Sequence, residues 1–479
     1  MYQWLGAILL LQGGVSLIVL RNSVSQDEAL YLTAGRQIAS HLLRGGAAPD
    51  SYAYRFSGLP YLYPPIAGAL DAIGGLELAR LLSLLAMLCT TIAVYVVGRS
   101  IDDERSGITA AAIFAVQAPT LLIGRLATYD ATCLLLLAIA TVLALRAGSA
   151  RTGHLAALVP VPLVLAIAMK YVGELFVPTI IAIMAVQTWR IYGWRAAIRR
   201  TAPVLALVGV LLCIGLLILT RADSAGVRLA ATTRAVENPL PRSELLRRAL
   251  LLAAPLSCLA VVGWYVSRRV PLSALLLVSV AVAPAFHLWK AEPVSLQKHI
   301  GYGLFFAAPL AGLGATRLLA GTQRQRIAAI ALALVAVGLG VEQAHQYYHD
   351  WPNDRALIAT LRTQIAPDSH ILTDDPDILR YELGDWRVDA RRRYVGLDEV
   401  ASVDASGRPL ASDDAYAAAL AGQYFDLIVI RATPDEVINK AIADDLRDST
   451  HYDLVATVPY ATRSTSEAYE IWRKRGAPG

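Results

Sequence analysis

The chain has 479 residues, of which 56% are hydrophobic and 17% charged, and its mean hydropathy is +0.49. This composition excludes an ordinary soluble protein of this size and indicates a polytopic membrane protein. Residues 1–342 hold 28 Lys and Arg against 15 Asp and Glu, whereas residues 343–479 hold 15 against 23. A basic membrane domain at 1–342 followed by a separate acidic domain at 343–479 is therefore expected, with no nucleic-acid partner.

Apolar runs predict about eleven membrane-spanning helices, several of them short of the ~20 residues that cross a bilayer. The first lacks a positively charged n-region and a small-residue cleavage site, so it is expected to be an uncleaved span rather than a signal peptide. The eleven runs lie at 4–20, 80–98, 107–123, 131–145, 155–169, 172–188, 202–220, 250–266, 271–289, 301–316 and 327–342.

The loops between these spans predict the orientation of the chain. With the N-terminus in the cytoplasm, the cytoplasmic loops hold 13 Arg in 43 residues, and the opposite loops hold basic residues at about half that density. The positive-inside rule favours this arrangement. It places the first loop (21–79), the short turn 124–130, the helix end near 170, the loops 221–249 and 290–300, and the acidic domain outside.

The first outer loop begins with an acidic pair, Asp27 and Glu28, in "SVSQDEALYLTAG". One interpretation is the acidic first turn of an amphipathic helix, which is favourable to the helix dipole. The other is a catalytic carboxylate. The same loop contains Arg55, Tyr61 and Tyr63, which are candidates for substrate binding, while tyrosines of this kind also form interfacial belts at membrane surfaces.

Further polar residues are predicted to lie on the same side of the membrane. Asp130 in "GRLATYDAT" is a second candidate catalytic acid, or a helix cap. Lys170 ends an apolar run and could bind phosphate or reach toward the interface. Lys298 and His299, in "QKHIGYG" with Tyr302, could bind a phosphate or lipid headgroups.

Carboxylates together with lysines and histidines at the outer end of a helical bundle suit one reaction type. A carboxylate accepts the proton of an acceptor hydroxyl as that hydroxyl attacks an anomeric carbon, and cations stabilise the departing phosphate. A transporter or flippase of a lipid-linked sugar is the alternative, and it predicts charges in mid-span and a repeat between halves. The sequence shows neither feature clearly.

The order of the motifs "SQDEALY", "YLYPPIAGAL", "LELARLLSLL", "RLATYDA", "MKYVG" and "KHIGYG" over residues 1–320 resembles one family. The chain is similar to the GT-C membrane glycosyltransferases of the protein O-mannosyltransferase and aminoarabinose transferase (ArnT-like) group. The resemblance implies inverting transfer of a monosaccharide from a polyprenyl-phosphate donor to an envelope glycan, lipid or protein. It also implies a multi-pass protein of the bacterial inner membrane.

Carried over to this chain, the resemblance implies that Asp27 is the catalytic acid, with Glu28 beside it, and that Asp130 orients the substrate. Lys170 and the pair Lys298–His299 resemble contacts to the donor phosphate. The chain departs from the family at Tyr63, where ArnT-like members often have a lysine, and it lacks the β-trefoil domain of the eukaryotic mannosyltransferases. No metal ligands are assigned, and a divalent cation, Mg²⁺ or Mn²⁺, stays open as a cofactor.

The acidic tail is expected to be a small α/β domain. Candidate strands at 370–375, 425–431, 453–461 and 469–475 alternate with helical stretches at 353–365, 413–421 and 434–447, which favours a partly parallel sheet. The acidic "TDDPD" at 373–377 is more typical of a turn at a strand end than of a metal site. The four cysteines lie inside apolar runs and are expected to serve in packing.

Overall fold

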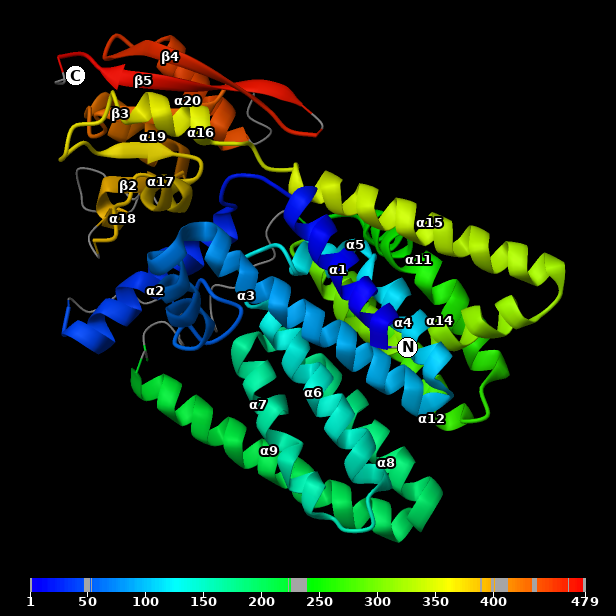
Figure 1. Ribbon diagram of the computed structural model, residues 1–479. Helices are drawn as coiled ribbons and strands as arrows, with labels where there is room; N and C mark the ends of the chain where they lie inside the picture. The colour runs from blue at the N-terminus through cyan, green and yellow to red at the C-terminus, as the bar shows by residue number, and fades with distance from the viewer. Residues whose placement is uncertain are drawn as a thin grey trace. The chain divides into compact units, whose positions relative to one another are not determined.

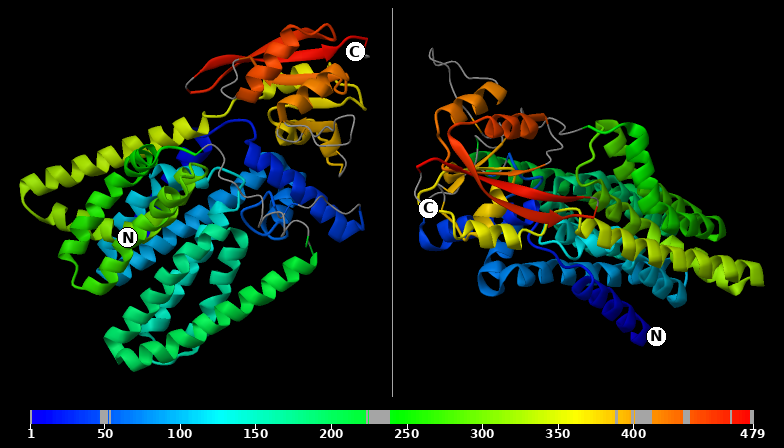
Figure 2. Two further views of the ribbon diagram at one scale, coloured as in Figure 1. Left: turned by 180° about the vertical axis from the view of Figure 1, so that it is seen from behind. Right: turned by 90° about the horizontal axis from the view of Figure 1, so that it is seen from above.

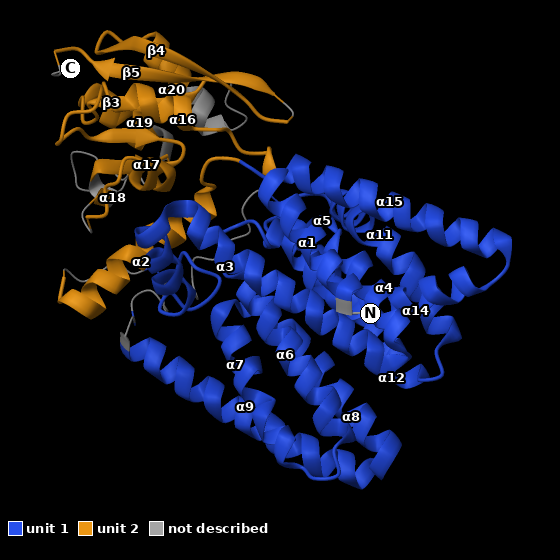
Figure 3. Cartoon of the chain, in the orientation of Figure 1, with its two compact units in different colours: residues 1–21, 51–347 blue, residues 22–50, 348–479 orange. Residues whose placement is uncertain are grey.

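The computed structural model (Figure 1) describes residues 2–46, 52, 54–222, 224, 239–387, 390–397, 400, 412–432, 437–463 and 465–476. Most of the expected outer loop 221–249 therefore lies outside the described residues. The chain divides into two compact units (Figure 3). Unit 1 comprises residues 1–21 and 51–347, and unit 2 comprises residues 22–50 and 348–479. The sequence interpretation instead assigns 22–50 to the membrane domain.

Unit 1 is helical throughout its described residues. Its helices are α1 (Tyr2–Ile18), α3 (Tyr63–Ile101), α4 (Glu104–Ala115), α5 (Ala118–Ile123), α6 (Asp130–Ser149), α7 (Pro160–Met169), α8 (Val177–Tyr192), α9 (Trp194–Ala222), α11 (Arg242–Val266), α12 (Val270–Val278), α13 (Val282–Lys290), α14 (Leu296–Ala320) and α15 (Gln323–Tyr348). Short 3₁₀ turns, η1 (His154–Leu158), η2 (Tyr171–Phe176) and η3 (Ser279–Ala281), join several of them.

Eight helices among the described residues are long and apolar enough to cross a membrane, and two shorter apolar helices, Gln3–Ile18 and His154–Met169, accompany them. The predicted polytopic helical fold is confirmed. The predicted span 107–123 is instead two short helices, α4 and α5. The break between them has a local cause, because Pro119 has no N–H to donate and restricts the backbone of the residue before it.

Helix α3 begins earlier than the apolar run predicts. Residues 63–79, expected as part of the first loop, belong to α3, and non-helical backbone at Gly74 and Gly75 separates residues 63–73 from the rest of the helix. Gly75 has φ +70°, a conformation that glycine adopts without steric cost. The kink joins the first turns of α3 and the long apolar helix that follows into one continuous element.

Helix α14 is the central helix of unit 1, with most of its residues buried. It packs against α4 and α11. A side chain at Gly312 would clash with the Ser106 carbonyl on α4, and one at Gly314 would clash with the Leu259 carbonyl on α11. Small residues let helix backbones approach closely in membranes, where apolar burial gives little drive for helix association. The glycines therefore fix the position of α14, which carries Lys298, His299 and Tyr302.

Unit 2 contains a five-stranded sheet, which confirms the predicted α/β tail. The strands are β1 (Ile371–Thr373), β2 (Tyr394–Gly396), β3 (Leu427–Arg431), β4 (Tyr452–Ala461) and β5 (Ser466–Lys474), in the order β2-β1-β3-β5-β4. Strand β1 pairs in parallel with β2 and β3, and β5 pairs antiparallel with β3 and β4. The sheet is thus partly parallel, as expected, while the short β2 was not anticipated.

Helices cover both faces of this sheet (Figure 2). The helices of unit 2 are α2 (Gln26–Arg44), α16 (Arg355–Leu361), α17 (Pro376–Glu382), α18 (Ala390–Arg393), α19 (Ser412–Ala421) and α20 (Val437–Arg447). Ile371 and Val429 pack with Leu357 of α16 on one face, and Leu372 packs with residues of α19 and α20 on the other. This alternation follows the period of two along a strand.

Helix α2 belongs to unit 2 although it lies in the segment between α1 and α3, which are both in unit 1. It packs on α17. The Asn22 amide donates to the carbonyls of Tyr348 and Trp351, both at 3.0 Å, and the Ser23 hydroxyl donates to the Pro352 carbonyl at 3.2 Å. These hydrogen bonds hold the segment that follows α1 against the segment at the end of α15. A helix does follow the first apolar run, as predicted. Its Ala29, Leu30, Leu32 and Ile38 are buried, whereas Leu42 near its end is 65% exposed.

Candidate active site

Unit 1 contains a buried ion pair between two predicted site residues. Asp130 is the first residue of α6, and Lys170 follows the end of α7. The Lys170 ammonium donates to Asp130 Oδ1 at 2.5 Å, and the two side chains are only 4% and 1% exposed. The Thr128 hydroxyl donates to the other carboxylate oxygen at 3.1 Å. The expectation that Asp130 and Lys170 share one end of the bundle is confirmed.

The chain around Gly58 holds the turn that carries Lys170. The Leu59 N–H donates to the Ala168 carbonyl and the Tyr171 N–H donates to the Ser57 carbonyl, both at 2.7 Å. A Cβ at Gly58 would clash with the Met169 carbonyl. Only glycine therefore allows this close approach, which supports the backbone on either side of Lys170.

Helix α14 contributes Tyr302 to the same place. Its hydroxyl donates to the Asp130 backbone carbonyl at 3.2 Å and lies 3.4 Å from Asp130 Oδ1. The Tyr302 ring stacks on Phe176 with 5.9 Å between centroids, and the side chain is fully buried. Asp130 thus receives hydrogen bonds from three directions. We call Asp130, Lys170, Tyr302, His299 and His287 the Asp130 cluster.

Two histidines complete the Asp130 cluster. His287 on α13 and His299 on α14 are both buried, and 2.8 Å separates His287 Nε2 from His299 Nδ1. His287 Nδ1 lies 2.5 Å from the Glu292 carbonyl oxygen. Lys298, also buried, neighbours His299 in sequence and acts on it electrostatically, as does Lys170. Lys170 therefore lies near enough to His299 to act on it electrostatically, and Lys298 is placed beside His299 by its position in α14.

Two buried arginines were missed from the sequence. Arg80 on α3 is fully buried, and Arg125, in the turn before α6, is 2% exposed. Glu77 pairs with Arg125 at 2.5 Å and with Arg80 at 3.5 Å, and Arg125 Nε donates to the Leu20 carbonyl at 3.0 Å. Burying cations is costly without partners, so their presence is a signal of a role. The signal in the sequence was the arginine within "LELARLLSLL" and the one within "RLATYDA".

The tyrosines and Arg55 of the first loop differ in their placement. Tyr63 is buried, and its ring meets the Tyr129 ring edge-on at 6.3 Å, next to the Lys170 ammonium that lies 5.2 Å from the Tyr129 ring centre. Tyr61 is 38% exposed, and Arg55 is half-buried in the turn before α3. The structure thus places Tyr63 beside the Asp130 cluster through Tyr129.

Asp27 and Glu28 lie in unit 2, in the first turn of α2. Glu28 is fully buried and accepts hydrogen bonds from the Ser25 N–H at 3.0 Å and from the Ser25 hydroxyl at 3.1 Å. This reciprocal arrangement is a capping box, which stabilises the start of a helix. Asp27, its neighbour, is half-buried. The structure therefore gives Glu28 a structural role and leaves Asp27 as the acid with a side chain not used in the cap.

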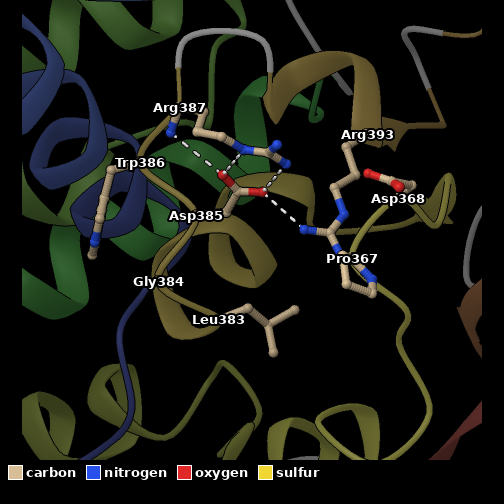
Figure 4. Close-up of a pocket in the computed structure, with 8 residues that line it drawn as sticks. All are labelled: Pro367, Asp368, Leu383, Gly384, Asp385, Trp386, Arg387 and Arg393. Carbon is tan, nitrogen blue, oxygen red and sulfur yellow. Dashed lines mark hydrogen bonds and ion pairs between the residues drawn. The ribbon is translucent and has the colours of Figure 1, made fainter.

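Unit 2 also has an open pocket that the sequence did not reveal (Figure 4). Its volume is about 590 Å³, and it is lined by Pro367, Asp368, Leu383, Gly384, Asp385, Trp386, Arg387 and Arg393. The Asp385 carboxylate accepts from Arg387 at 3.0 and 3.1 Å and from Arg393 at 3.0 Å. Burial acts against it, but these hydrogen bonds lower the pKa of Asp385. Arg36 of α2 stacks over Trp386 at 3.8 Å.

Among the described residues, no group of three or more His, Cys, Asp or Glu side chains is arranged to hold a metal ion. At "TDDPD", Asp374 and Asp375 lie between β1 and α17, and both pair with Arg431, at 3.8 and 2.9 Å. The acids are thus used in an ion-pair network at the end of β1, which is the predicted strand-end turn.

The comparisons with known proteins agree with this architecture. Residues 72–218 match the family model described as dolichyl-phosphate-mannose-protein mannosyltransferase. The crystal structure of ArnT from Cupriavidus metallidurans bound to undecaprenyl phosphate is 13% identical, with a TM-score of 0.63 over 100% of this chain and 99% of that one. The chain has the GT-C fold. The resemblance to the ArnT and protein mannosyltransferase group is confirmed.

Two further solved structures share the fold. The oligosaccharyltransferase AglB from Archaeoglobus fulgidus, in complex with an inhibitory peptide and a dolichol-phosphate, is 11% identical, with a TM-score of 0.58 over 97% of this chain and 74% of that one. The arabinofuranosyltransferase AftD from Mycobacteria is 16% identical, with a TM-score of 0.54 over 99% of this chain and 41% of that one. No curated protein sequence matches the chain.

Proposed function

We propose that the protein is an inverting glycosyltransferase that moves a monosaccharide from a polyprenyl-phosphate donor to an envelope acceptor. The observation that carries the proposal is the buried Asp130–Lys170–Tyr302 arrangement at one end of a GT-C bundle. Two of the structural neighbours are described with a bound polyprenyl phosphate, undecaprenyl phosphate on ArnT and dolichol-phosphate on AglB. The proposal gives this chain a donor of the same chemical class.

In this mechanism each group has one task. Asp27 accepts the proton from the acceptor hydroxyl as its oxygen attacks the anomeric carbon, and the bond from that carbon to the phosphate oxygen breaks. Asp130 orients the substrate. Lys170 and Lys298 stabilise the charge that develops on the departing phosphate, in a place where few waters screen it. Glu28 supports Asp27 by fixing the start of α2.

The buried arginines extend this cationic environment. Arg80 and Arg125 share Glu77 in the same unit, and Arg125 is held five residues before Asp130. Because guanidinium groups bind phosphate oxygens through two parallel hydrogen bonds, these residues suit a lipid-linked phosphate. We include them among the residues that bind the donor or support those that do.

We further propose that the protein lies in the bacterial inner membrane, with its N-terminus in the cytoplasm and unit 2 outside. The asymmetry of Arg between the loops supports this orientation. The acceptor is proposed to be an envelope glycan, lipid or protein. A divalent cation, Mg²⁺ or Mn²⁺, is proposed only as an accessory to the donor phosphate. Loss of transfer with EDTA and recovery with either ion would support that accessory role.

The test is transfer of label from a polyprenyl-phosphate sugar to envelope acceptors by the purified full-length protein. Asp27→Asn is expected to lose at least a hundredfold in rate. Glu28→Gln is expected to lose less, because the amide still accepts the Ser25 hydrogen bonds. Full activity in Asp27→Asn would remove Asp27 as the base. Translocation of the lipid-linked sugar without a transfer product would favour the transporter instead.

A further inference from the structure

His287 and His299 form a hydrogen-bonded chain whose proton positions follow from the atoms involved. The Glu292 carbonyl oxygen only accepts hydrogen bonds, so His287 Nδ1, at 2.5 Å, must carry a proton. A neutral His287 then has an unprotonated Nε2. Among the residues that the structure describes, the partner that donates to it is His299 Nδ1, at 2.8 Å, which therefore carries a proton.

The last atom of this hydrogen-bonded chain is His299 Nε2, and the tautomer of His299 determines whether it carries a proton. When His299 is neutral and protonated at Nδ1, its Nε2 has a lone pair and no hydrogen. This atom is closed to solvent and has no hydrogen-bond partner among the described residues. Buried polar atoms are rarely left without a partner, so such an atom in a candidate site indicates a ligand.

The surroundings support the neutral form of both rings. Lys170 acts electrostatically on His287 and His299, and Lys298 acts on His299. A further positive charge in this buried place would be unfavourable beside two ammonium groups. The pair therefore ends in a hydrogen-bond acceptor rather than a donor.

The loop that receives the His287 hydrogen bond is itself held in an uncommon conformation. Ala291 and Ser295, at its two ends, have φ of 55° and 62°, a region that residues with a side chain rarely adopt. Such conformations persist only where the surroundings hold them, and they gather at functional sites. His287 supplies one of these restraints, directly before the α14 turn that carries Lys298 and His299.

We propose that His287 is a positioning residue that fixes the tautomer of His299, and that His299 Nε2 accepts a hydrogen bond from a hydroxyl group of the transferred sugar. The inference rests on the proposed glycosyl transfer. An acceptor lone pair repels phosphate oxygens, so the geometry assigns His299 to the sugar and leaves the donor phosphate to Lys170 and Lys298.

The tautomer is measured without any ligand. Full-length protein labelled with ¹⁵N-histidine and placed in lipid bilayers is expected to show His299 with a protonated Nδ1 and an unprotonated Nε2, its signals being assigned by their loss in His299→Gln. In His287→Ala the two tautomers are expected to mix. A protonated Nε2 on His299 of the wild-type protein would overturn the proposal.

The ligand assignment is measured with two lipid probes. These are undecaprenyl phosphate alone and undecaprenyl phosphate that carries glucose, mannose or arabinose. His299→Ala is expected to keep the Kd for undecaprenyl phosphate within about twofold and to weaken the tightest sugar-linked probe roughly tenfold, as for one lost hydrogen bond. Lys170→Gln, the control, is expected to weaken both. Equal losses for both probes in His299→Ala would assign His299 to the phosphate and refute the proposal.

A rescue separates the positioning role of His287 from a merely structural one. The amide of His287→Gln can donate to the Glu292 carbonyl and accept from His299 Nδ1, so it is expected to restore sugar affinity to within about threefold of wild type, whereas His287→Ala is expected to lose roughly tenfold. Equal losses in the two variants would contradict the positioning role. A wild-type protein that binds neither lipid contradicts the proposed function instead, while the tautomer measurement still decides the histidine chain.

Discussion

Two buried aspartates, one in each unit, are neutralised in different ways. Asp130 in unit 1 has the Lys170 ammonium at 2.5 Å, whereas Asp354 in unit 2, 2% exposed, accepts one hydrogen bond from the Tyr469 hydroxyl at 3.0 Å. The second oxygen of Asp354 has no hydrogen-bond partner among the described residues. Burial raises the pKa of Asp354 to about 7, and the Tyr469 hydrogen bond only partly offsets this.

Whether a cation lies beside a buried acid determines whether the acid is held in an ion pair or titrates near neutral pH. A paired acid stays ionised and can orient a substrate, and removal of its partner is severe because a charge is left in a low-dielectric place. An acid without a cation holds its proton up to neutral pH. Unit 1 therefore holds its buried acid in an ion pair with Lys170, while the buried acid of unit 2 carries a proton that responds to pH.

The largest expected effect comes from removing one partner of the pair in unit 1. Lys170→Met leaves Asp130 buried and unpaired, so we expect a loss of roughly 3–5 kcal/mol in the free energy of unfolding and no detectable transfer. The double variant Asp130→Asn with Lys170→Met is expected to recover most of the stability without the activity. Thermal unfolding of the purified proteins in one detergent checks both. Equal stability of the single and double variants would contradict the picture of a coupled pair.

The second prediction concerns pH and unit 2. The folded state keeps the Asp354 proton up to about pH 7, whereas the unfolded state releases it near its ordinary pKa of 3.8. Between these values the folded state binds more protons, so stability falls as pH rises, by up to about 4 kcal/mol in total. Asp354→Asn is expected to remove this slope and to be more stable than wild type at pH 8.

The measurement for Asp354 is the melting temperature across pH 4 to 8. Asp368→Asn, which removes an exposed carboxylate from the same unit, serves as the matched control and is expected to keep the wild-type slope. A slope that persists unchanged in Asp354→Asn would show that another group binds the proton.

A smaller effect is expected at Gly58, which packs against the backbone next to Lys170. Gly58→Ala places a Cβ against the Met169 carbonyl, so the backbone must shift, and we expect a loss of about 1–3 kcal/mol together with slower transfer. Gly153→Ala, where nothing lies within 4 Å of the added atom, is the control and is expected to be near wild type. Stability and transfer rate are compared for the two variants. Wild-type values for Gly58→Ala would show that this contact does not hold the turn.

The smallest effect is expected for Arg387, the exposed arginine that pairs with Asp385 in the unit 2 pocket. Arg387 is 56% exposed, and Arg393 also donates to Asp385, so Arg387→Ala is expected to cost less than about 1 kcal/mol. Thermal unfolding at low and high salt checks this. The melting temperatures of Arg387→Ala and the wild type are expected to differ less at high salt, because salt screens an exposed ion pair. A loss as large as that of Lys170→Met would erase the contrast between exposed and buried pairs.

The sequence predicted well where a local pattern decides the structure. Eight of the eleven predicted apolar runs lie in described helices long enough to cross a membrane, the candidate strands of the tail lie in the sheet, and Asp130 and Lys170 lie together at one end of the bundle. These signals are local because helix and strand periodicity act over a few residues. The break at Pro119 and the kink at Gly75 are also local, but they were concealed inside apolar stretches.

The features that could not be predicted depend on contacts between residues that are far apart in the sequence. Nothing near Asn22 indicates that its amide binds carbonyls 326 and 329 residues away, so the membership of α2 in unit 2 could not be predicted. His287 and His299 could both be noticed in the sequence, but their direct contact across two helices could not be predicted from it. Arg80 and Arg125 were overlooked because an arginine at the end of an apolar run usually lies at the interface.

The fastening of Asn22 and Ser23 to the segment after α15 also sets an order of events during synthesis. Helix α2 is made soon after the first span, but its partners, Tyr348, Trp351 and α17, are made only after all the remaining helices of unit 1. Contacts between residues so far apart close late, because the intervening chain must first be placed. Unit 2 therefore becomes complete only after α15, the last helix of unit 1, has been made, although the local cap of α2 by Ser25 and Glu28 can form earlier.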